Sequence, residues 1–286
     1  MVYDDLISRG TVAALLQSAG IRPSKRLGQN FLVDRSVLLT IVSELERDNP
    51  EEILEIGAGL GTVTRELARI ASRVVAVEVD HRLIRLLHQT LGGYRNVEII
   101  EEDVLKFDFA RRFGDRPVTI VGNIPYRITS PILRYLIDHR RSISSALLLA
   151  QTDVVEKIAA SPGPDGTALG VLVQAYCDVS IVRHIGRRCF LPPPTVDSAF
   201  WCLSLLERPR FSADAETFFR VVQTLYGTRR KMIRRALRSW LTKDQIERVL
   251  EEAGIDPTVR GETLPFEKLD RVALAVNRST DNAASS

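Results

Sequence analysis

The alternation of short β-rich runs with amphipathic helical runs constrains the fold of this chain more than any other feature. The β-rich runs are 53–56, 74–79, 97–100 and 118–121, and helical runs lie between them at 62–71 and 83–91. Apolar residues recur at helical spacing in the second kind of run, and Val and Ile predominate in the first. This rhythm predicts a doubly wound α/β fold, with a parallel sheet covered by helices on both faces.

The strand signals end near residue 207. Two more strand-like runs at 179–185 and 199–206 precede that point, and helical patterns follow it, including one over 229–241. A length of 286 residues suits one large and one small domain. We expect an α/β domain over 1–207 with a helical lead-in over 1–27, a helical domain over 208–276, and a disordered tail over 277–286.

The composition is that of an ordinary soluble globular protein, with 45% hydrophobic and 26% charged residues. No run approaches the length of a membrane span, and the N-terminus has the wrong charge order for a secretory signal. Cys177, Cys189 and Cys202 form no C-x-x-C spacing, and the four histidines show no ligand motif. We therefore expect a cytoplasmic protein with no metal and no membrane partner.

Polar residues or glycines follow the carboxyl end of every predicted strand. They are Glu55 with Gly57, Glu78 with Asp80, Asp103, and Asn123. In open α/β sheets, ligands bind in the crevice beyond these ends, where the strand order reverses. One crevice could collect all of these groups.

The order of these groups indicates a nucleoside pocket. Glycines at 57, 59 and 61 make a G-x-G-x-G loop that lacks the third glycine of a dinucleotide motif, and taken alone it could be a simple turn. Glu78 lies about 20 residues further on, where a carboxylate can accept both ribose hydroxyls, and Asp103 could accept from an adenine amine. Each acid alone could equally be solvated. Together they suit S-adenosylmethionine better than NAD, because no pyrophosphate site is present.

The stretch "NIPY" at 123–126 places an amide, a proline and an aromatic ring at the end of the fourth strand. The Asn123 side-chain oxygen and a backbone carbonyl near Pro125 could hold both hydrogens of an exocyclic adenine amine. Tyr126 could stack on the base, a contact worth about 1–3 kcal/mol elsewhere. The alternative is a turn that ends a strand beside a core tyrosine.

Six motifs resemble the ribosomal RNA adenine dimethyltransferases, in the same order, over about residues 20–270. They are "GQNFLVD" (28–34), "EIGAGLG" (55–61), "VEVD" (77–80), "ED" (102–103), "NIPY" (123–126) and "FLPPPTVDS" (190–198). Within this family the likeness is to enzymes that dimethylate two adjacent adenines near the 3′ end of small-subunit rRNA. The resemblance implies a Rossmann-like class I S-adenosylmethionine methyltransferase domain that acts in ribosome biogenesis.

The resemblance also implies residue roles. Asn30 and Leu32 would contact the methionine end of the cofactor and Gly57 its backbone-facing side, with Glu78 at the ribose and Asp103 at the adenine. Asn123 would lie between cofactor and target amine. Phe190 would stack on the flipped adenine opposite Tyr126, although by itself Phe190 reads as a core residue. Two departures are Ala58, where the family often has Pro, and Arg127, which could reach a phosphate.

Basic residues concentrate between residues 208 and 238, where nine Arg or Lys face two acids, against a net charge of +3 for the chain. If 229–241 is one helix, five cations fall within two turns and could follow an RNA backbone. They are Arg229, Arg230, Lys231, Arg234 and Arg235. A solvated helix face is the alternative.

The expected partner is small-subunit rRNA in an assembly intermediate, bound by a monomer. The competing functions are methylation of a large-subunit rRNA adenine, as in antibiotic resistance, and a non-catalytic assembly or RNA-binding factor on the same fold.

Overall fold

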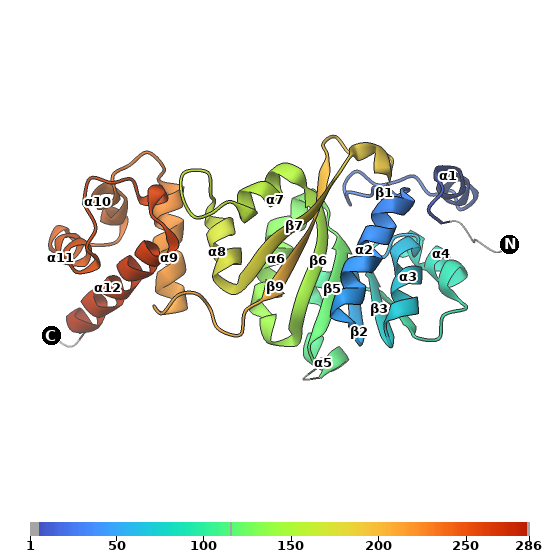
Figure 1. Ribbon diagram of the computed structural model, residues 1–286, viewed down its shortest axis with the longest axis horizontal. Helices are drawn as coiled ribbons and strands as arrows, with labels where there is room; N and C mark the ends of the chain where they lie inside the picture. The colour runs from blue at the N-terminus through green and yellow to red at the C-terminus, as the bar shows by residue number, and fades with distance from the viewer. Residues whose placement is uncertain (1–5, 115, 285–286) are drawn as a thin grey trace. The chain divides into compact units, whose positions relative to one another are not determined.

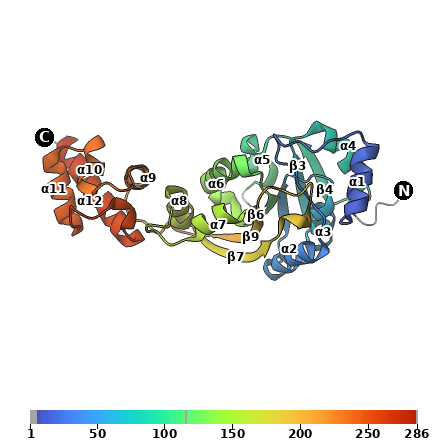
Figure 2. The same ribbon diagram turned by 90° about the horizontal axis from the view of Figure 1, so that it is seen from above.

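The computed structural model describes residues 6–114 and 116–284, without the side chains of Tyr126 and of residues 280–284. The described chain divides into two compact units. The first comprises residues up to 155 together with 180–205, and the second comprises 156–179 together with the residues from 206 onward. Figures 1 and 2 show the elements of both units.

The first unit is built on a seven-stranded sheet with the order β4-β3-β2-β5-β6-β9-β7. Its strands are β2 (Glu52–Ile56), β3 (Arg73–Glu78), β4 (Val97–Glu101), β5 (Val118–Asn123), β6 (Ile143–Gln151), β7 (Cys177–Ile185) and β9 (Ser198–Leu205). The pairs from β4 to β6 are parallel, and β9 is antiparallel to β6. The four predicted strands are confirmed as β2 to β5, and the strand order reverses between β2 and β5.

Helices cover both faces of this sheet, as expected. In both views α2 (Arg35–Asp48) and α3 (Thr62–Ile70) lie on one face, and α5 (Phe109–Phe113) and α6 (Thr129–Asp138) lie on the other. The remaining helices that begin in this unit are α1 (Arg9–Ser18), α4 (His81–Leu91) and α7 (Thr152–Ala159). Apolar residues of α2 and α3 pack on β2, β3 and β5 in one buried cluster.

A second, two-stranded sheet joins segments that are far apart in the sequence. β1 (Phe31–Leu32) pairs antiparallel with β8 (Phe190–Leu191), with Phe31 opposite Leu191 and Leu32 opposite Phe190. The Val33 amide extends the ladder by donating to the Cys189 carbonyl at 2.8 Å. The segment around β1 is thereby fixed beside the segment around β8.

The second unit holds α8 (Ala168–Tyr176), α9 (Ala215–Gly227), α10 (Ile233–Ala236), α11 (Lys243–Ala253) and α12 (Phe266–Ala284). Its core is aromatic, with the Phe211 and Phe218 rings stacked 4.4 Å apart. Residues 156–179 belong here because the Gly163 amide donates to the Tyr226 hydroxyl and the Arg210 amide donates to the Ala175 carbonyl. The chain therefore passes from one unit to the other after residues 155, 179 and 205, and the expected boundary at 208 corresponds only to the last of these points.

Two sequence-based expectations need correction. Residues 229–241 are not one helix, because residues 228–232 form a turn and α10 has four residues followed by a 3-10 turn at Leu237–Ser239. α12 continues to Ala284, beyond the expected end at 276.

Within the described residues, no helix is both long and apolar enough to cross a membrane. The same part of the chain contains no group of three or more His, Cys, Asp or Glu placed to hold a metal ion.

Candidate active site

A pocket opens at the carboxyl ends of β2, β3 and β5, where the strand order reverses. It is lined by the glycine loop, by the strand-end acids and by the segment that leads into β1. Of the predicted cofactor-binding and catalytic residues, seven line it: Asn30, Leu32, Gly57, Glu78, Asp103, Asn123 and Pro125. The structure therefore brings together residues that are up to 95 positions apart in the chain.

The glycine loop runs from β2 into α3 through three left-handed residues. Gly57, Gly59 and Gly61 have φ of +77°, +60° and +81°. A Cβ at Gly61 would lie 3.1 Å from Leu91 and from the Thr90 hydroxyl, both on α4. Glycine is needed here for conformation and for close approach, because other residues are strained at positive φ. The loop leaves the pocket wall free of side chains at these positions.

Glu78 holds the glycine loop against the end of β3. Its side chain is 5% exposed, one carboxylate oxygen accepts from the Gly59 amide and the other from the Asp80 amide, both at 2.9 Å. Burial raises the pKa of Glu78, and these two amides partly offset the rise. Each carboxylate oxygen can accept more than one hydrogen bond, so Glu78 can also receive hydroxyl donors from the pocket.

Glu55 is a second buried acid in the pocket wall. Its side chain is 3% exposed, and its Oε2 has no hydrogen-bond partner among the described residues. Burial raises the pKa of Glu55 to about 8, with a further contribution from the charge of Glu78. Its position at the end of β2 was visible in the sequence, but its burial depends on packing that the sequence does not display.

The segment 27–32 joins the two sides of the pocket. Gln29 donates from its side-chain amide to Asp80 at 2.7 Å, on the β3 side. Arg82 and then Gln29 lower the pKa of Asp80 to about 2, so this acceptor stays ionised. On the β5 side, a Cβ at Gly28 would lie 2.8 Å from the Cβ of Pro125. Sequence reasoning missed Gln29, although it stands inside the "GQNFL" motif.

Asn123 has a fixed orientation at the end of β5. Its side-chain NH2 group donates to the Asn30 carbonyl at 3.0 Å. Because a carbonyl only accepts, the NH2 group must face Asn30, and Oδ1 is left as the acceptor of the side chain. The Pro125 carbonyl accepts from the Ile128 amide at 3.0 Å and keeps a second lone pair. Two acceptors are thus held at the same lip of the pocket.

Asp103 and Val79 line the pocket just after the ends of β4 and β3. Asp103 is exposed, and its Oδ1 accepts from the Leu105 amide at 3.1 Å as the cap of a 3-10 turn at Val104–Lys106. Val79 is 52% exposed, which is unusual for a large apolar residue. An exposed apolar side chain between two acids offers a flat contact to an aromatic base.

The two residues predicted to stack on the target base are Tyr126 and Phe190. The side chain of Tyr126 lies outside the described part of the structure. Phe190 is 1% exposed and belongs to the core cluster with Ile41 and Phe200, and it is not among the pocket-lining residues described above. This placement matches the core interpretation of Phe190, and its stacking on a base stays a prediction.

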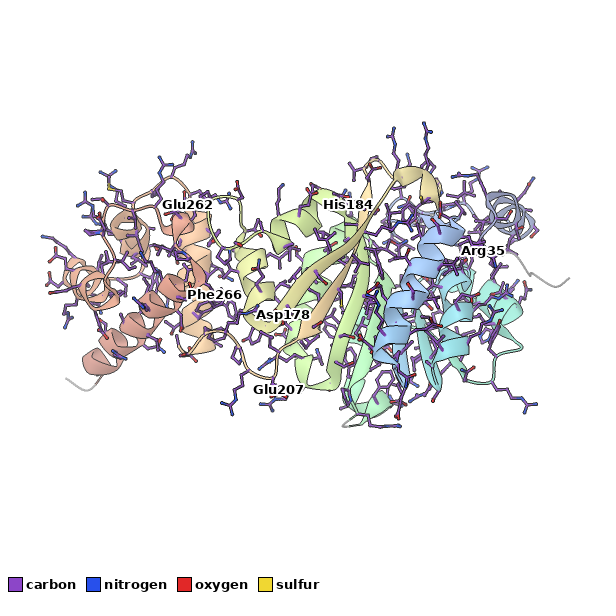
Figure 3. The ribbon with its side chains drawn as sticks, in the orientation of Figure 1. Arg35, Asp178, His184, Glu207, Glu262 and Phe266 are labelled. Carbon is purple, nitrogen blue, oxygen red and sulfur yellow. The ribbon has the colours of Figure 1, made fainter. Side chains whose placement is uncertain are left out.

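The predicted RNA-binding residues lie in the second unit, on the turn 228–232 and on α10. All five are exposed. The Arg229 guanidinium is tied to the Gly166 carbonyl and lies over the Tyr226 ring, whereas the other four form no ion pair within the described residues. Glu262, 6% exposed, accepts from the Arg230 amide at 2.9 Å beside α9 (Figure 3).

The pocket fits S-adenosylmethionine and does not fit a dinucleotide. Four acids and no Lys, Arg or His are among its described lining residues, and the acids are Glu55, Glu78, Glu102 and Asp103. A pyrophosphate would meet uncompensated negative charge there, whereas a ligand with a sulfonium, an ammonium and two ribose hydroxyls supplies the complementary groups. The fold and this site define a class I S-adenosylmethionine-dependent methyltransferase.

Comparison with known proteins identifies the family. The model of the family described as "Ribosomal RNA adenine dimethylase" matches residues 21–277, and the chain belongs to that family. The small-subunit methyltransferase A of Clostridioides difficile (strain 630) is 36% identical over 282 residues, which is 96% of this chain and 98% of that protein. The protein of the same name from Clostridium acetobutylicum is 39% identical over 268 residues, 92% of this chain and 97% of that one.

Solved structures support the same fold. The 23S rRNA methyltransferase ErmE is 27% identical, with a TM-score of 0.68, and the match covers 87% of this chain and all of that one. A dimethyladenosine transferase from Plasmodium falciparum has a TM-score of 0.76 at 24% identity, covering 87% and 98% of the two chains.

Proposed function

We propose that this chain transfers methyl groups from S-adenosylmethionine to the exocyclic amines of two adjacent adenines near the 3′ end of small-subunit rRNA, two to each, during ribosome assembly. Support comes from relatives named small-subunit rRNA methyltransferase A that match almost the whole chain at 36–40% identity. The match to the 23S enzyme is weaker, at 27% identity, so the large-subunit alternative is less favoured.

The orientation of Asn123 is the observation that carries the proposed chemistry. An adenine amine is a weak nucleophile because its lone pair is delocalised into the ring. Two acceptors, Asn123 Oδ1 and the Pro125 carbonyl, would hold its hydrogens and favour a pyramidal nitrogen. The bound cofactor supplies an electrophilic methyl group on sulfur. Holding the amine in line with it is worth roughly 7–11 kcal/mol in favourable cases. A strong general base is not required, because the nitrogen becomes cationic and acidic once it carries the methyl group and then loses its proton to water.

The cofactor contacts follow from the lining of the pocket. Glu78 would accept the ribose hydroxyls, Asp103 the adenine amine, and Asn30 and Leu32 would face the methionine end, with Gly57 at its back. Tyr126 would stack on the target base. Flipping that base out of its stack costs a few kcal/mol, least in a loop.

The second unit would dock the RNA. Arg230, Lys231, Arg234 and Arg235 are exposed cations that could contact phosphates, and Arg229 supports the turn from behind. We further propose that the protein acts as a monomer in the cytoplasm, where such an assembly intermediate is found. Sedimentation of the protein alone and with substrate RNA tests the monomer.

The direct test is transfer of tritiated methyl groups to unmethylated small and large ribosomal subunits, followed by digestion to nucleosides. Dimethyladenosine from the small subunit, approaching four methyl groups per particle, is expected. Label confined to the large subunit would support the resistance-type activity instead. No label in either would favour a non-catalytic assembly or RNA-binding factor.

The Asn123→Ala variant tests the residue assignment. Removing one preorganised hydrogen-bonding group from a reacting centre typically lowers kcat by about 100- to 1000-fold, and we expect a loss of this size. Cofactor affinity, measured by calorimetry, should change by no more than about threefold, because Asn123 acts on the amine. An equal loss of cofactor binding would contradict the role assigned to Asn123.

A further inference from the structure

Three segments beside the pocket contain cations and no acids. They are 22–33, 121–134 and 180–196, with three, two and three Arg or Lys respectively and no Asp or Glu. Acids occupy 36 of the 286 positions, so three segments of this combined length would hold about five at the average frequency. The absence of all of them leaves a positive charge that nothing within the segments balances.

The three segments converge on one side of the pocket. Gly28 touches Pro125, and the Asn30 carbonyl accepts from Asn123, which joins the first segment to the second. The ladder between β1 and β8 joins the first to the third. Figure 1 shows β1 and the end of β7 at the same end of the sheet, and Figure 3 shows His184 of the third segment there.

Six of the eight cations in these segments are free to meet a partner at the pocket edge, since Arg134 lies within α6 and Arg183 donates to the Ser36 carbonyl and the Thr40 hydroxyl. The set is Arg22, Lys25, Arg26, Arg127, Arg187 and Arg188, which we call the rim cations. All six are exposed, and none forms an ion pair with a described carboxylate. Lys25 and Arg26 directly precede Leu27 of the pocket wall, and Arg127 stands between two wall residues, Pro125 and Ile128.

The opposite side of the pocket mouth carries the reverse charge. The ends of β3 and β4 contribute five acids at 78–80 and 101–103, of which only Asp80 is ion-paired within the described chain, with Arg82: Glu78, Asp80, Glu101, Glu102 and Asp103. Fields of exposed charges decay over about 8 Å at physiological ionic strength, so each side acts locally. A polyanion is repelled from the acidic side and attracted to the rim cations, while a cationic cofactor prefers the acidic side.

We propose that the rim cations bind the phosphate backbone of the RNA strand that carries the target adenine, so that the base enters the pocket from the β1 and β5 side. This inference rests on the proposed function and adds to it a second RNA surface, on the catalytic unit itself. A strand running along the rim passes Arg127, next to the acceptors that would receive the flipped base. The rim therefore sets the direction from which the substrate approaches.

The test replaces one rim cation from each segment, in the triple variant Lys25→Gln, Arg127→Gln, Arg188→Gln. The matched control is Arg95→Gln, Arg111→Gln, Arg141→Gln, three exposed arginines without an ion pair among the described residues. These control arginines come shortly before β4, β5 and β6 in the sequence, so they lie near the amino ends of the strands, away from the pocket. In Figure 1, α5, which carries Arg111, lies at the end of the sheet opposite β1. Both variants change the net charge equally.

The readouts are binding to a protein-free RNA that contains the 3′-terminal segment of small-subunit rRNA, over about 50–300 mM salt, and methyl-transfer kinetics on the same RNA. For single strands, each lost phosphate contact makes the negative slope of log affinity against log salt shallower by about 0.7. The rim variant, which loses three cations, should therefore have a slope shallower by about 2. Its KM for RNA should rise by about tenfold or more, with cofactor affinity unchanged. The control variant should match the wild type.

The outcomes separate the two proposals. A rim variant whose RNA affinity and salt slope equal those of the control overturns the RNA surface, even if the wild type methylates normally. A wild type that binds RNA through the rim but transfers no methyl group upholds the surface and refutes the proposed function. A loss seen only with ribosomal particles, and not with protein-free RNA, would assign the rim to a protein partner and overturn the inference.

Discussion

The turn at 57–61 in the first unit and the turn at 228–232 in the second are each held by one buried glutamate. Glu78 accepts from the Gly59 amide, and Glu262 accepts from the Arg230 amide, both at 2.9 Å. Both donors have positive φ, +60° for Gly59 and +74° for Arg230. The same local device therefore supports two turns with different tasks.

The difference lies in the left-handed residue. Glycine adopts this conformation freely, whereas a residue with a side chain is strained there by roughly 1–2 kcal/mol. The first turn is bare on the pocket side, and the second keeps an exposed arginine in spite of the strain. Strain retained in a rigid setting points to use of that side chain. The first turn leaves space in the pocket wall, and the second exposes a cation that the proposed RNA contact would use.

The largest expected contrast between the two units is in how their free energy of unfolding depends on pH. Glu55 keeps its proton in the folded state up to about pH 8, whereas its unfolded value is 4.5. The unfolded chain therefore binds fewer protons between these values, and the stability of the first unit falls as pH rises through this window, by up to about 5 kcal/mol. Glu55→Gln should reduce the decline, and so gain stability near pH 8 with little change near pH 5, while the raised pKa of Glu78 leaves a remainder of the same sign.

Each unit has its own fluorescent reporter for that measurement. Trp201 is in the first unit and Trp240 in the second, and the chain has no other tryptophan. Urea unfolding in a Trp240→Phe background follows the first unit alone. An equal pH dependence before and after the Glu55 substitution would show that another group is responsible.

The second contrast is in cofactor binding. Glu78→Ala removes the acceptor proposed for the ribose and loosens the glycine loop, and losing a charged hydrogen-bonding partner of this kind costs about 2–4 kcal/mol, or about 100-fold in Kd. Glu262→Ala is the control, because it loosens the other turn. Calorimetry with S-adenosylmethionine should show the loss only for Glu78, and a similar loss in both variants would remove the distinction.

The third contrast compares backbone strain directly. Gly59→Ala forces a Cβ into positive φ within 3.4 Å of the Phe31 ring, so it should destabilise the first unit by about 1–2 kcal/mol. Gly93→Ala, where φ is not positive and no atom lies near, is the control and should be neutral. Equal midpoints in urea for both variants would argue against a strained loop.

The smallest expected effect is at Arg230. Arg230→Gly relieves the left-handed strain and should stabilise the second unit by about 0.5–1 kcal/mol while weakening RNA binding. Arg230→Ala keeps the strain and removes only the charge, so it should weaken RNA binding without the gain in stability. Thermal unfolding and RNA affinity of the two variants separate strain from charge.

The elements with strong local signals were predictable from the sequence. β2 to β5 are short runs rich in Val, Ile and Leu, and the spacing of Gly57, Gly59 and Gly61 predicted the glycine loop that they form. The family motifs predicted that Asn30 and Asn123 lie at the same site, and both line the pocket.

The parts that sequence reasoning missed depend on distant partners. The basic run 229–241 has good helical spacing. However, the Glu262 carboxylate accepts a hydrogen bond from the Arg230 amide, and Met232 forms an isolated β-bridge with Arg260, so the start of the run is held as a turn. Residues 156–179 join the second unit through Tyr226 and Arg210, dozens of positions later. The burial of Glu55 likewise arises from packing between segments that no local pattern encodes.

The segment 27–32 has a thermodynamic consequence. It is anchored to Asp80 after β3 and to Asn123 and Pro125 at the end of β5. If the cofactor and the target base bind on these two sides, as proposed, a ligand that shifts this segment from one side would change the affinity of the other side. Linkage makes the effect mutual, so the factor by which the methyl donor changes RNA affinity equals the factor by which RNA changes donor affinity. The order in which the two ligands arrive then affects rates but not the final occupancy.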